Sequence, residues 1–321
     1  MDKERVVIDR KRLSEIAQSI RLLKNIHPLE FCDDASFFFP PINDTSVLDF
    51  FFSSVLHQFG FWELKSNRYT YPFIRHIDGH LLKGSDYLWR VWRRAGEKFS
   101  DFYRPEVQHS ISKKDFIYLL RDDKGVTDTP MLEHHFKLTR AYGNDMLKLG
   151  VSPDEIIGCL NKTKYPVKNF TKIMSRISGY KEDPYLKKLM LLIIVLKNRP
   201  ENFLKIKDIS HLKPIVDYHI QRSCLRTGIV VVSDSTLRMK LVKRQRIKAN
   251  EELLIRSKAY KAIKLLSRLS GRGIDVIDFF FFMNRKNCPE MTKPVCETCG
   301  IYKTCARYVE LFQPIFRTTF Y

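Results

Sequence analysis

A mainly helical, two-lobed fold with a small extended element near the amino terminus is predicted by three features of this sequence. Apolar residues recur at helical spacing over most of the chain, and 321 residues at about 150 per domain provide for two lobes. Hydrophobic residues make up 44% of the chain, which supplies a core and excludes wholesale disorder. The longest apolar runs fall far short of the roughly 18 to 20 residues that a membrane span requires. The charged start, MDKERVVIDRKR, also lacks the apolar stretch of a secretory signal, so we expect a cytoplasmic protein that does not bind membranes.

In the amino-terminal part, local patterns predict helices, an irregular segment and the extended element. Apolar spacing predicts a helix over Val6–Leu23. The aromatic segment Phe31–Pro41 is expected to be irregular, because its proline pair breaks regular structure. Alternating β-forming residues over Ser66–Ile74 predict the extended element, and Tyr87–Phe99 has the spacing of an amphipathic helix.

Beyond residue 112, helical segments recur with only short breaks between them. The predicted helices are Ser112–Arg121, Pro130–Gly143, Asn144–Leu149, Ser152–Leu160, Asn169–Ser178, Pro184–Lys197, Val216–Arg226, Ala249–Ser270 and Ile274–Arg285. No internal repeat or low-complexity linker interrupts the series. We expect a helical lobe over residues 1–150, a second helical lobe over 151–285 and a cysteine-bearing loop and tail over 286–321, in a monomeric protein.

Net charge indicates the class of partner. Fifty-six Lys and Arg residues against thirty-six Asp and Glu residues leave a formal charge of +20. Such an excess favours polyanions, because each phosphate contact releases condensed counterions. Between Asp234 and Arg272 there are twelve basic residues and only three acidic ones. A basic surface with no nucleic-acid role is the alternative, but so one-sided a stretch favours a surface that follows a DNA backbone.

Four of the seven cysteines crowd into eighteen residues near the carboxyl terminus, with the spacing C-x7-C-x2-C-x5-C. They are Cys288, Cys296, Cys299 and Cys305. In a cytosolic chain such a group is typical of a metal site rather than of disulfides. Zinc ribbons usually present two separated C-x2-C pairs and this run has only one, which favours a [4Fe–4S] cluster, with zinc as the alternative. The scattered Cys32, Cys159 and Cys224 are expected to be small buried hydrophobes.

The segment Lys213–Gly228 contains the strongest candidate for catalysis. Pro214 ends whatever precedes it, and Asp217 falls at the expected N-cap of a helix that begins at Tyr218. A capping carboxylate that accepts a backbone N–H is the structural interpretation of Asp217. A carboxylate held at a helix start beside a groove can also stabilise a cationic sugar transition state and orient a water molecule.

Two sequence motifs, in the same order along the chain, resemble those of the helix-hairpin-helix DNA glycosylases of the endonuclease III type. The segment Val216–Ile220, VDYHI, resembles the family's V-D-x-H segment, in which the Asp is catalytic. The cysteine run resembles its C-x6-C-x2-C-x5-C motif, which binds [4Fe–4S], with one extra residue in the first spacer. The segment Asp275–Cys288 is similar to the helix that leads into that motif, and the resemblance covers Lys213 to Cys305. It implies a two-lobed glycosylase fold, a catalytic Asp217 and a cluster held by the four cysteines.

The sequence departs from that family before the Asp. The glycine-rich hairpin L-P-G-V-G is replaced by Ile206–Pro214, which contains no glycine. The lysine that makes some members β-lyases belongs to that missing motif. The resemblance therefore implies hydrolysis of the glycosidic bond without strand cleavage, that is, a monofunctional enzyme.

A looser resemblance to the queuosine-salvage N-glycosylases extends over more of the chain. Val47–Phe50 and Phe59–Trp62 look like that family's L-D-x-x-N-F-x-F-W region with an insertion, and Glu252–Arg256 is similar to its E-x-E-I-R helix. Val216–Tyr218 resembles its A-D-Y segment, so both resemblances place the catalytic carboxylate at Asp217. This comparison implies an alternative substrate, a free 7-deazaguanine nucleotide.

Breaking an N-glycosidic bond in DNA requires a carboxylate, a pocket for the flipped base and contacts to phosphates. For the pocket, the candidates are Phe61, Trp62 and Tyr218, with Asp49 or His57 to read the base edge. Candidates for the nucleic-acid backbone are Arg256, Lys258, Lys261, Lys286, Lys293, Lys303 and Arg307. Core packing is the alternative for the aromatic residues, and a solvated helix face is the alternative for the basic ones.

The sequence thus predicts a DNA glycosylase that excises a modified or damaged base. A hypermodified phage base, excised in an antiviral role, is one conceivable target. The alternatives are the nucleotide N-glycosidase and a non-enzymatic, basic iron–sulfur module that binds nucleic acid.

Overall fold

The computed structural model describes residues 4–33, 35–66 and 68–321 and divides the chain into two compact units. Unit 1 consists of Met1–Leu29, Leu64–Tyr71 and Lys213–Arg317. Unit 2 consists of Glu30–Glu63, Pro72–Leu212 and Thr318–Tyr321. These units differ from the expected segments 1–150, 151–285 and 286–321, because the first residues of the chain pack with its last third.

The prediction of a mainly helical protein is confirmed. The described residues form thirteen α-helices, and their strands pair only in two-stranded sheets. None of these helices combines the length and the apolar character needed to cross a bilayer.

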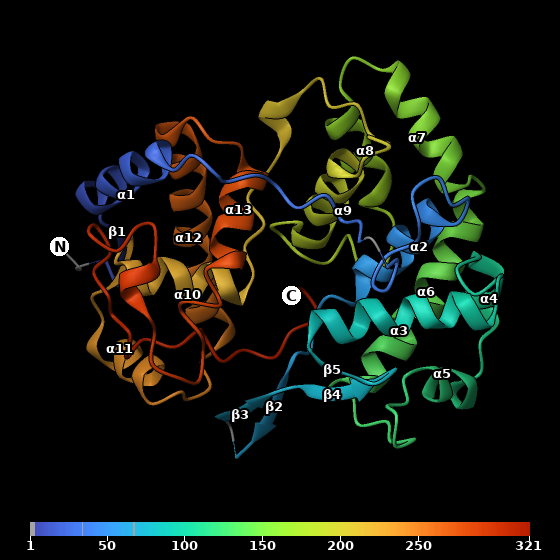
Figure 1. Cartoon of the computed structure of the whole chain (residues 1–321), viewed down its shortest axis with the longest axis horizontal. Coiled ribbons are helices and arrows are strands. Elements are labelled where there is room, and N and C mark those ends of the chain that lie inside the picture. The colour runs from blue at the N-terminus through green and yellow to red at the C-terminus, as the bar shows by residue number, and fades with distance from the viewer. Residues whose placement is uncertain (1–3, 34, 67) are drawn as a thin grey trace. The chain divides into compact units, whose positions relative to one another are not determined.

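Unit 1 is built around its longest helix, α12. Its elements are β1 (Val6–Ile8), α1 (Arg10–Leu22), α10 (Tyr218–Thr227), β6 (Val230–Val232), α11 (Ser235–Val242), α12 (Ala249–Ser270), α13 (Ile274–Met283) and the 3₁₀ turn η3 (Cys296–Thr298). In Figure 1, α10, α12 and α13 lie side by side, and α1 packs against α12. Their apolar faces form one continuous core with β1 and β6.

The first predicted helix begins later than expected because its first residues pair as a strand. Val6 is opposite Val232 and Ile8 is opposite Val230 in an antiparallel ladder. Asp9 then caps α1 by accepting the Arg12 backbone N–H at 2.9 Å. Three consecutive β-branched residues favour a strand, and the strand's partner lies too far along the sequence for a local pattern to reveal it.

Unit 2 is a larger set of helices with one hairpin. Its elements are α2 (Val47–Ser54), the 3₁₀ turn η1 (Val55–His57), β4 (Ile74–Ile77), β5 (His80–Lys83), α3 (Ser85–Lys98), α4 (Pro105–Ser110), α5 (Lys113–Leu119), α6 (Leu132–Leu149), α7 (Pro153–Lys162), α8 (Pro166–Met174), α9 (Lys187–Asn198) and the 3₁₀ turn η2 (Ile209–His211). Strands β2 (Trp62–Lys65) and β3 (Arg68–Pro72) pair with each other and run from unit 2 into unit 1 and back.

Several elements of both units differ from those predicted. Helices α2, α4 and α11 were not predicted. The two helices expected over residues 130–149 form the single helix α6. Gly143 lies inside α6, where the lack of a side chain allows the close approach of α4: a Cβ atom there would be 2.5 Å from both the Pro105 carbonyl oxygen and the His109 nitrogen. Of the three scattered cysteines, only Cys224 is buried; Cys32 is partly exposed and Cys159 is exposed, contrary to expectation.

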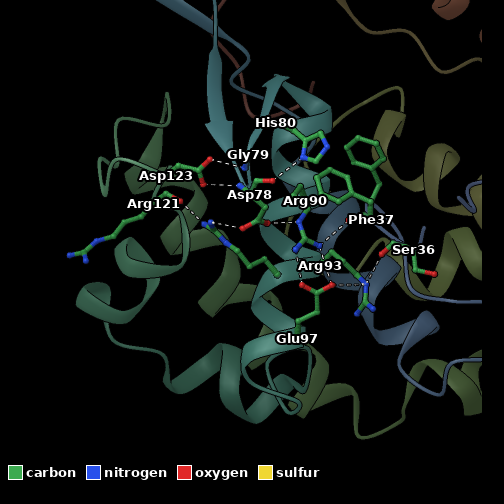
Figure 2. A network of polar contacts seen from close by, with 12 residues as sticks. Ser36, Phe37, Asp78, Gly79, His80, Arg90, Arg93, Glu97, Arg121 and Asp123 are labelled. Carbon is green, nitrogen blue, oxygen red and sulfur yellow. Dashed lines mark hydrogen bonds and ion pairs between the residues drawn. The ribbon is translucent and has the colours of Figure 1, made fainter. Parts of the chain in front are cut away.

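A network of charged side chains fixes the β4–β5 turn onto α3 (Figure 2). Asp78 and Gly79 form the turn with positive φ angles of 50° and 78°. Their backbone N–H groups donate to the carboxylate of Asp123 at 2.7 and 2.9 Å. The Asp78 carboxylate accepts from Arg90 Nε at 2.5 Å, and Arg90 also pairs with both oxygens of Glu97. Since each carboxylate of this network has a donor, we assign it a structural role.

Candidate active site

Asp217 lies at the amino-terminal end of α10, as the sequence predicts. Its Oδ1 atom accepts a hydrogen bond of 3.0 Å from the Ile220 backbone N–H. That contact satisfies one of the N–H groups that every helix start leaves without an intrahelical partner. Over the described residues, Oδ2 accepts no hydrogen bond, and the side chain is partly exposed. One carboxylate oxygen is therefore fixed by the helix, while the other is available to water or a ligand.

The peptide just before Asp217 is held from α12. Nε of Arg256 donates a hydrogen bond of 2.9 Å to the Val216 carbonyl oxygen, and Val216 is fully buried. Arg256 itself is only 1% exposed. The prediction that Arg256 contacts a nucleic-acid backbone is therefore wrong, because its guanidinium is enclosed within unit 1. Its contact instead fixes the segment that carries Asp217.

Polar side chains on α10 make further buried contacts that were not predicted. Gln221 Nε2 donates to Glu252 Oε1 on α12 at 3.1 Å. Arg222 donates to Gln313 Oε1 at 2.9 Å and lies 3.4 Å from the Glu290 carboxylate. Buried polar contacts of this kind specify one position of a helix, because leaving any partner unsatisfied costs free energy. They hold α10 in a defined position relative to α12 and the carboxyl-terminal segment.

The carboxyl-terminal end of α10 contacts the cysteine-bearing loop. Nη1 of Arg226 donates to Cys288 Sγ at 3.2 Å and to the Pro289 carbonyl oxygen at 2.8 Å. In return, the Cys305 thiol donates to the Arg226 carbonyl oxygen at 3.8 Å. A ten-residue helix is about 15 Å long. One helix therefore joins the candidate carboxylate Asp217 at its start to the cysteine loop at its end.

Two of the four thiols of the loop, those of Cys299 and Cys305, have raised pKa values. Burial raises the pKa of Cys299, and the neighbouring thiols of Cys288 and Cys296 raise it further. Burial likewise raises the pKa of Cys305, against a lowering by the Arg307 backbone N–H, which donates to its sulfur at 3.4 Å. The other three thiols raise the pKa of Cys305 again.

The cysteine loop has N–H donors of the kind that accompany thiolate ligands of a metal centre. N–H groups of Arg226 and Arg307 are directed at two of the sulfur atoms, and such donors stabilise thiolate ligands. Among the described residues, no three His, Cys, Asp or Glu side chains are arranged to hold a single metal ion. A [4Fe–4S] cluster would be held by Cys288, Cys296, Cys299 and Cys305 and would bind the loop to the end of α10.

We expect anaerobically purified protein to contain about four iron atoms and matching sulfide per chain. Cys299→Ser removes one ligand and should lower the iron content and the visible absorbance together. Elemental analysis with sulfide determination measures both. The matched control is Cys32→Ser, which changes a partly exposed thiol of unit 2 and should leave iron unchanged. About one zinc per chain without iron would contradict the cluster and support the zinc alternative.

The base pocket predicted from sequence divides between the two units. Tyr218 is buried in unit 1, where burial and the charges of Glu290 and Asp217 raise its pKa well above the usual value. Phe61 and Trp62 belong to unit 2 and are 9% and 4% exposed. The ring of Phe61 packs on Gly84, where an added Cβ atom would be 3.1 Å away. For these two aromatic residues the structure shows core packing.

The two edge-reading candidates also have separate surroundings. Asp49 is partly exposed on α2, and burial followed by the charge of Asp154 raises its pKa to about 6. His57 is fully buried, stacks on Trp92 with ring centroids 4.0 Å apart and has its Nδ1 3.0 Å from Nδ1 of His135. None of the contacts described for Asp49 is shared with His57.

His57 belongs to a buried basic cluster in unit 2 that was not predicted. The cluster consists of His57, His135 and Lys188, and burial lowers the pKa of all three. The His135 ring stacks on the Phe59 ring with the ring centroids 4.0 Å apart. Lys188 Nζ lies 4.4 Å from the centroid of the Phe59 ring. Burial and the charge of the neighbouring Lys187 lower the pKa of Lys188 to about 7.

We expect this cluster to make unit 2 more stable as the pH rises from about 7 to about 9, with a slope of up to about 1.4 kcal/mol per pH unit. In that range an unfolded lysine, with a pKa of about 10.4, binds a proton that the folded Lys188 does not. Lys188→Met removes this linkage, so the variant should be more stable than wild type near pH 7, and its advantage should shrink as the pH rises. Urea unfolding followed by tryptophan fluorescence measures it, with the exposed Lys148→Met as the control. A variant less stable than wild type by a constant amount at every pH would contradict a neutral buried amine.

The other predicted backbone contacts lie at or near the surface. Lys258 is 15% exposed at its side chain and forms an ion pair with Glu4. Five of the candidates are exposed: Lys261, Lys286, Lys293, Lys303 and Arg307. Their exposure leaves both the phosphate-contact prediction and the solvated-face alternative open.

No protein-family model matches this chain, and no curated protein matches its sequence.

Proposed function

We propose that this protein is a monofunctional DNA glycosylase, which hydrolyses the N-glycosidic bond of a modified or damaged base flipped out of DNA. One observation carries the proposal: α10 holds a partly exposed carboxylate at its start and contacts a four-cysteine loop at its end. This is the pair of features on which the resemblance to endonuclease III-type glycosylases depends, and in unit 1 a single helix connects them.

The geometry suits Asp217 to the proposed chemistry. As the glycosidic bond breaks, positive charge develops on the sugar, and a nearby carboxylate stabilises it and orients the attacking water. Oδ1 is held by the Ile220 N–H, so Oδ2 is the oxygen that would face the sugar and the water. The helix start also favours a negative charge at this position, because the helix dipole is positive there.

The remaining parts have supporting roles in this proposal. Arg256 positions the Asp217 segment through the Val216 carbonyl oxygen. The cysteine loop, ordered by the metal centre that its four cysteines would hold, would present the exposed Lys286, Lys293 and Lys303 to the DNA backbone. Since no lysine occupies the position of the β-lyase lysine, the product is expected to be an intact strand with an abasic site.

A second candidate function is hydrolysis of a free 7-deazaguanine nucleotide. It is favoured by the block Val47–Trp62, whose resemblance to queuosine-salvage enzymes lies outside the glycosylase-like segment. In the structure this block forms α2, η1 and the start of β2 in unit 2. The same Asp217 would supply the carboxylate.

The test is base release, measured by mass spectrometry, from a panel of substrates offered to wild type and to Asp217→Asn. The panel contains damaged duplexes, hypermodified phage DNA and free 7-deazaguanine nucleotides. Release from DNA that is lost in the variant would support the glycosylase and identify its base. Release from the free nucleotide alone would overturn the glycosylase and support the second candidate.

A further inference from the structure

A basic groove of about 810 Å³ lies in unit 1, in a part of the molecule that the proposed chemistry does not use. The β2–β3 tip, the end of α11, the start of α12 and the carboxyl-terminal segment line it. Four of its lining side chains are cationic: Arg68, Lys240, Arg246 and Lys248. Among the described residues, no acidic side chain lines it.

Three of these cations are not neutralised by the protein. Lys240 Nζ lies 2.8 Å from Glu251 Oε1, so its charge is compensated. Over the described residues, the side chains of Arg68, Arg246 and Lys248 form no ion pair, and all three are exposed. Three uncompensated cations around one groove repel one another, and an anion in the groove relieves that repulsion.

The walls of the groove are held together by hydrogen bonds. The Tyr69 hydroxyl on β3 donates to the Phe316 carbonyl oxygen at 3.2 Å. The Ile247 backbone N–H donates to the Ile315 carbonyl oxygen at 3.0 Å. Burial raises the pKa of Tyr69 to about 12, against the opposing effects of the Arg317 and Arg246 charges. The groove is therefore a built feature of unit 1, because segments remote in sequence are joined around it.

We infer that this groove binds consecutive phosphate groups of a polynucleotide backbone. Three free cations exceed the charge of one phosphate group, and arginine side chains match phosphate oxygens in pairs. Ser66 and Gln245 add neutral hydrogen-bonding groups, and Phe316 is the one aromatic residue among those that line the groove. Such a lining suits a sugar–phosphate backbone better than a stacked base.

This inference goes beyond the proposed glycosylase, since binding in the groove requires no base release. It is tested in the Asp217→Asn background with unmodified duplex DNA, so that failure of the chemistry and failure of the groove remain distinguishable. The groove variant is Arg68→Gln/Arg246→Gln/Lys248→Gln. The matched control is Lys148→Gln/Lys172→Gln/Arg176→Gln, which removes three exposed charges from unit 2.

Affinity for the duplex, for inorganic phosphate and for ATP is measured against salt concentration, with far-UV circular dichroism to check folding. We expect the groove variant to bind the duplex about tenfold or more weakly, and its salt slope to fall by about 2 to 3 units, since each phosphate contact contributes about 0.9. The control should keep the wild-type slope.

An unchanged slope in the groove variant would overturn the inference. An effect confined to inorganic phosphate or ATP would also overturn it and assign the groove to a free phosphate ligand. The single variant Lys248→Gln, with an expected slope change of about 1, decides the matter if the triple variant does not fold.

Discussion

Asp217→Asn is expected to lower base release by about a hundredfold to a thousandfold while leaving the fold intact. Asparagine caps helices about as well as aspartate, so the hydrogen bond from the Ile220 N–H should survive the change. What disappears is the negative charge that stabilises the sugar cation and attracts the proton of the attacking water. The variant therefore separates the structural interpretation of Asp217 from the catalytic one. Single-turnover release of the base, from whichever substrate the panel identifies, measures the effect.

Two further variants complete this comparison. Asp217→Ala removes the cap and the charge together, so it should lose about 1 kcal/mol of stability in addition to the activity. Asp9→Asn is the matched control, because Asp9 is also a partly exposed N-cap in unit 1 and accepts the Arg12 backbone N–H at 2.9 Å. Asp9→Asn should change neither activity nor stability appreciably.

The possible results separate the three functional hypotheses. Loss of release in Asp217→Asn, with wild-type stability and DNA affinity, is the result that we expect. Full activity in that variant would show that Asp217 is a cap and no more. If no substrate releases a base while duplex DNA binds wild type and variant equally, the non-enzymatic binding module is the remaining explanation.

The helical part of the fold was predictable because its signals are local. The spacing of apolar residues predicts a helix over Ala249–Ser270, which are the observed bounds of α12. The proline and aspartate before α10 predict its N-cap at Asp217, as observed. Pairing between β1 and β6 was not predictable, since it joins segments more than two hundred residues apart. Unit 1 depends on this pairing and on the packing of α1 against α12, which also joins segments far apart in the sequence.

Buried charged residues were the main source of error in the site. The basic stretch between Asp234 and Arg272 predicts a phosphate contact for Arg256, but the structure buries this side chain. A signal was nevertheless present in the sequence of α12. Glu252 and Arg256 continue the stripe of Ala259, Ile263 and Leu266 at helical spacing, and all five are buried. A charged residue within an apolar stripe indicates a buried polar contact, here the hydrogen bonds to α10 and to the segment that precedes it.

Arg199→Met is expected to destabilise unit 2 by about 3 to 5 kcal/mol, the usual effect of breaking a buried ion pair by removing one partner. The Arg199 side chain is 0% exposed, and it donates to both oxygens of Glu201, at 2.8 and 3.0 Å. It also donates to the carbonyl oxygens of Phe31 and Pro40, at 2.8 and 3.3 Å. Methionine fills much of the same space, but it leaves a carboxylate that is 7% exposed without its cation.

Urea unfolding followed by tryptophan fluorescence reports on unit 2 specifically, because all three tryptophans, Trp62, Trp89 and Trp92, belong to it. The matched control is Arg104→Met. Arg104 also belongs to unit 2 and pairs with Asp101 at 3.3 Å, but the two side chains are 68% and 59% exposed. Exposed pairs contribute about 0 to 1 kcal/mol, so the control should unfold almost as wild type does.

The pH dependence of the Arg199→Met deficit distinguishes a lost charge pair from lost packing. Burial would raise the pKa of Glu201, but in the wild-type protein the hydrogen bonds and charge of Arg199 hold it below the usual range. A carboxyl group with a lowered folded pKa contributes stability above its unfolded pKa of about 4.3, and this is lost as the pH falls through the folded value. In the variant, only backbone N–H groups, including that of Asn43, still oppose the effect of burial, so the folded protein takes up the proton more readily. The deficit should therefore be largest near neutral pH and shrink below about pH 4. A deficit of the same size at acid pH would show that lost packing, rather than an unpaired carboxylate, weakens the variant.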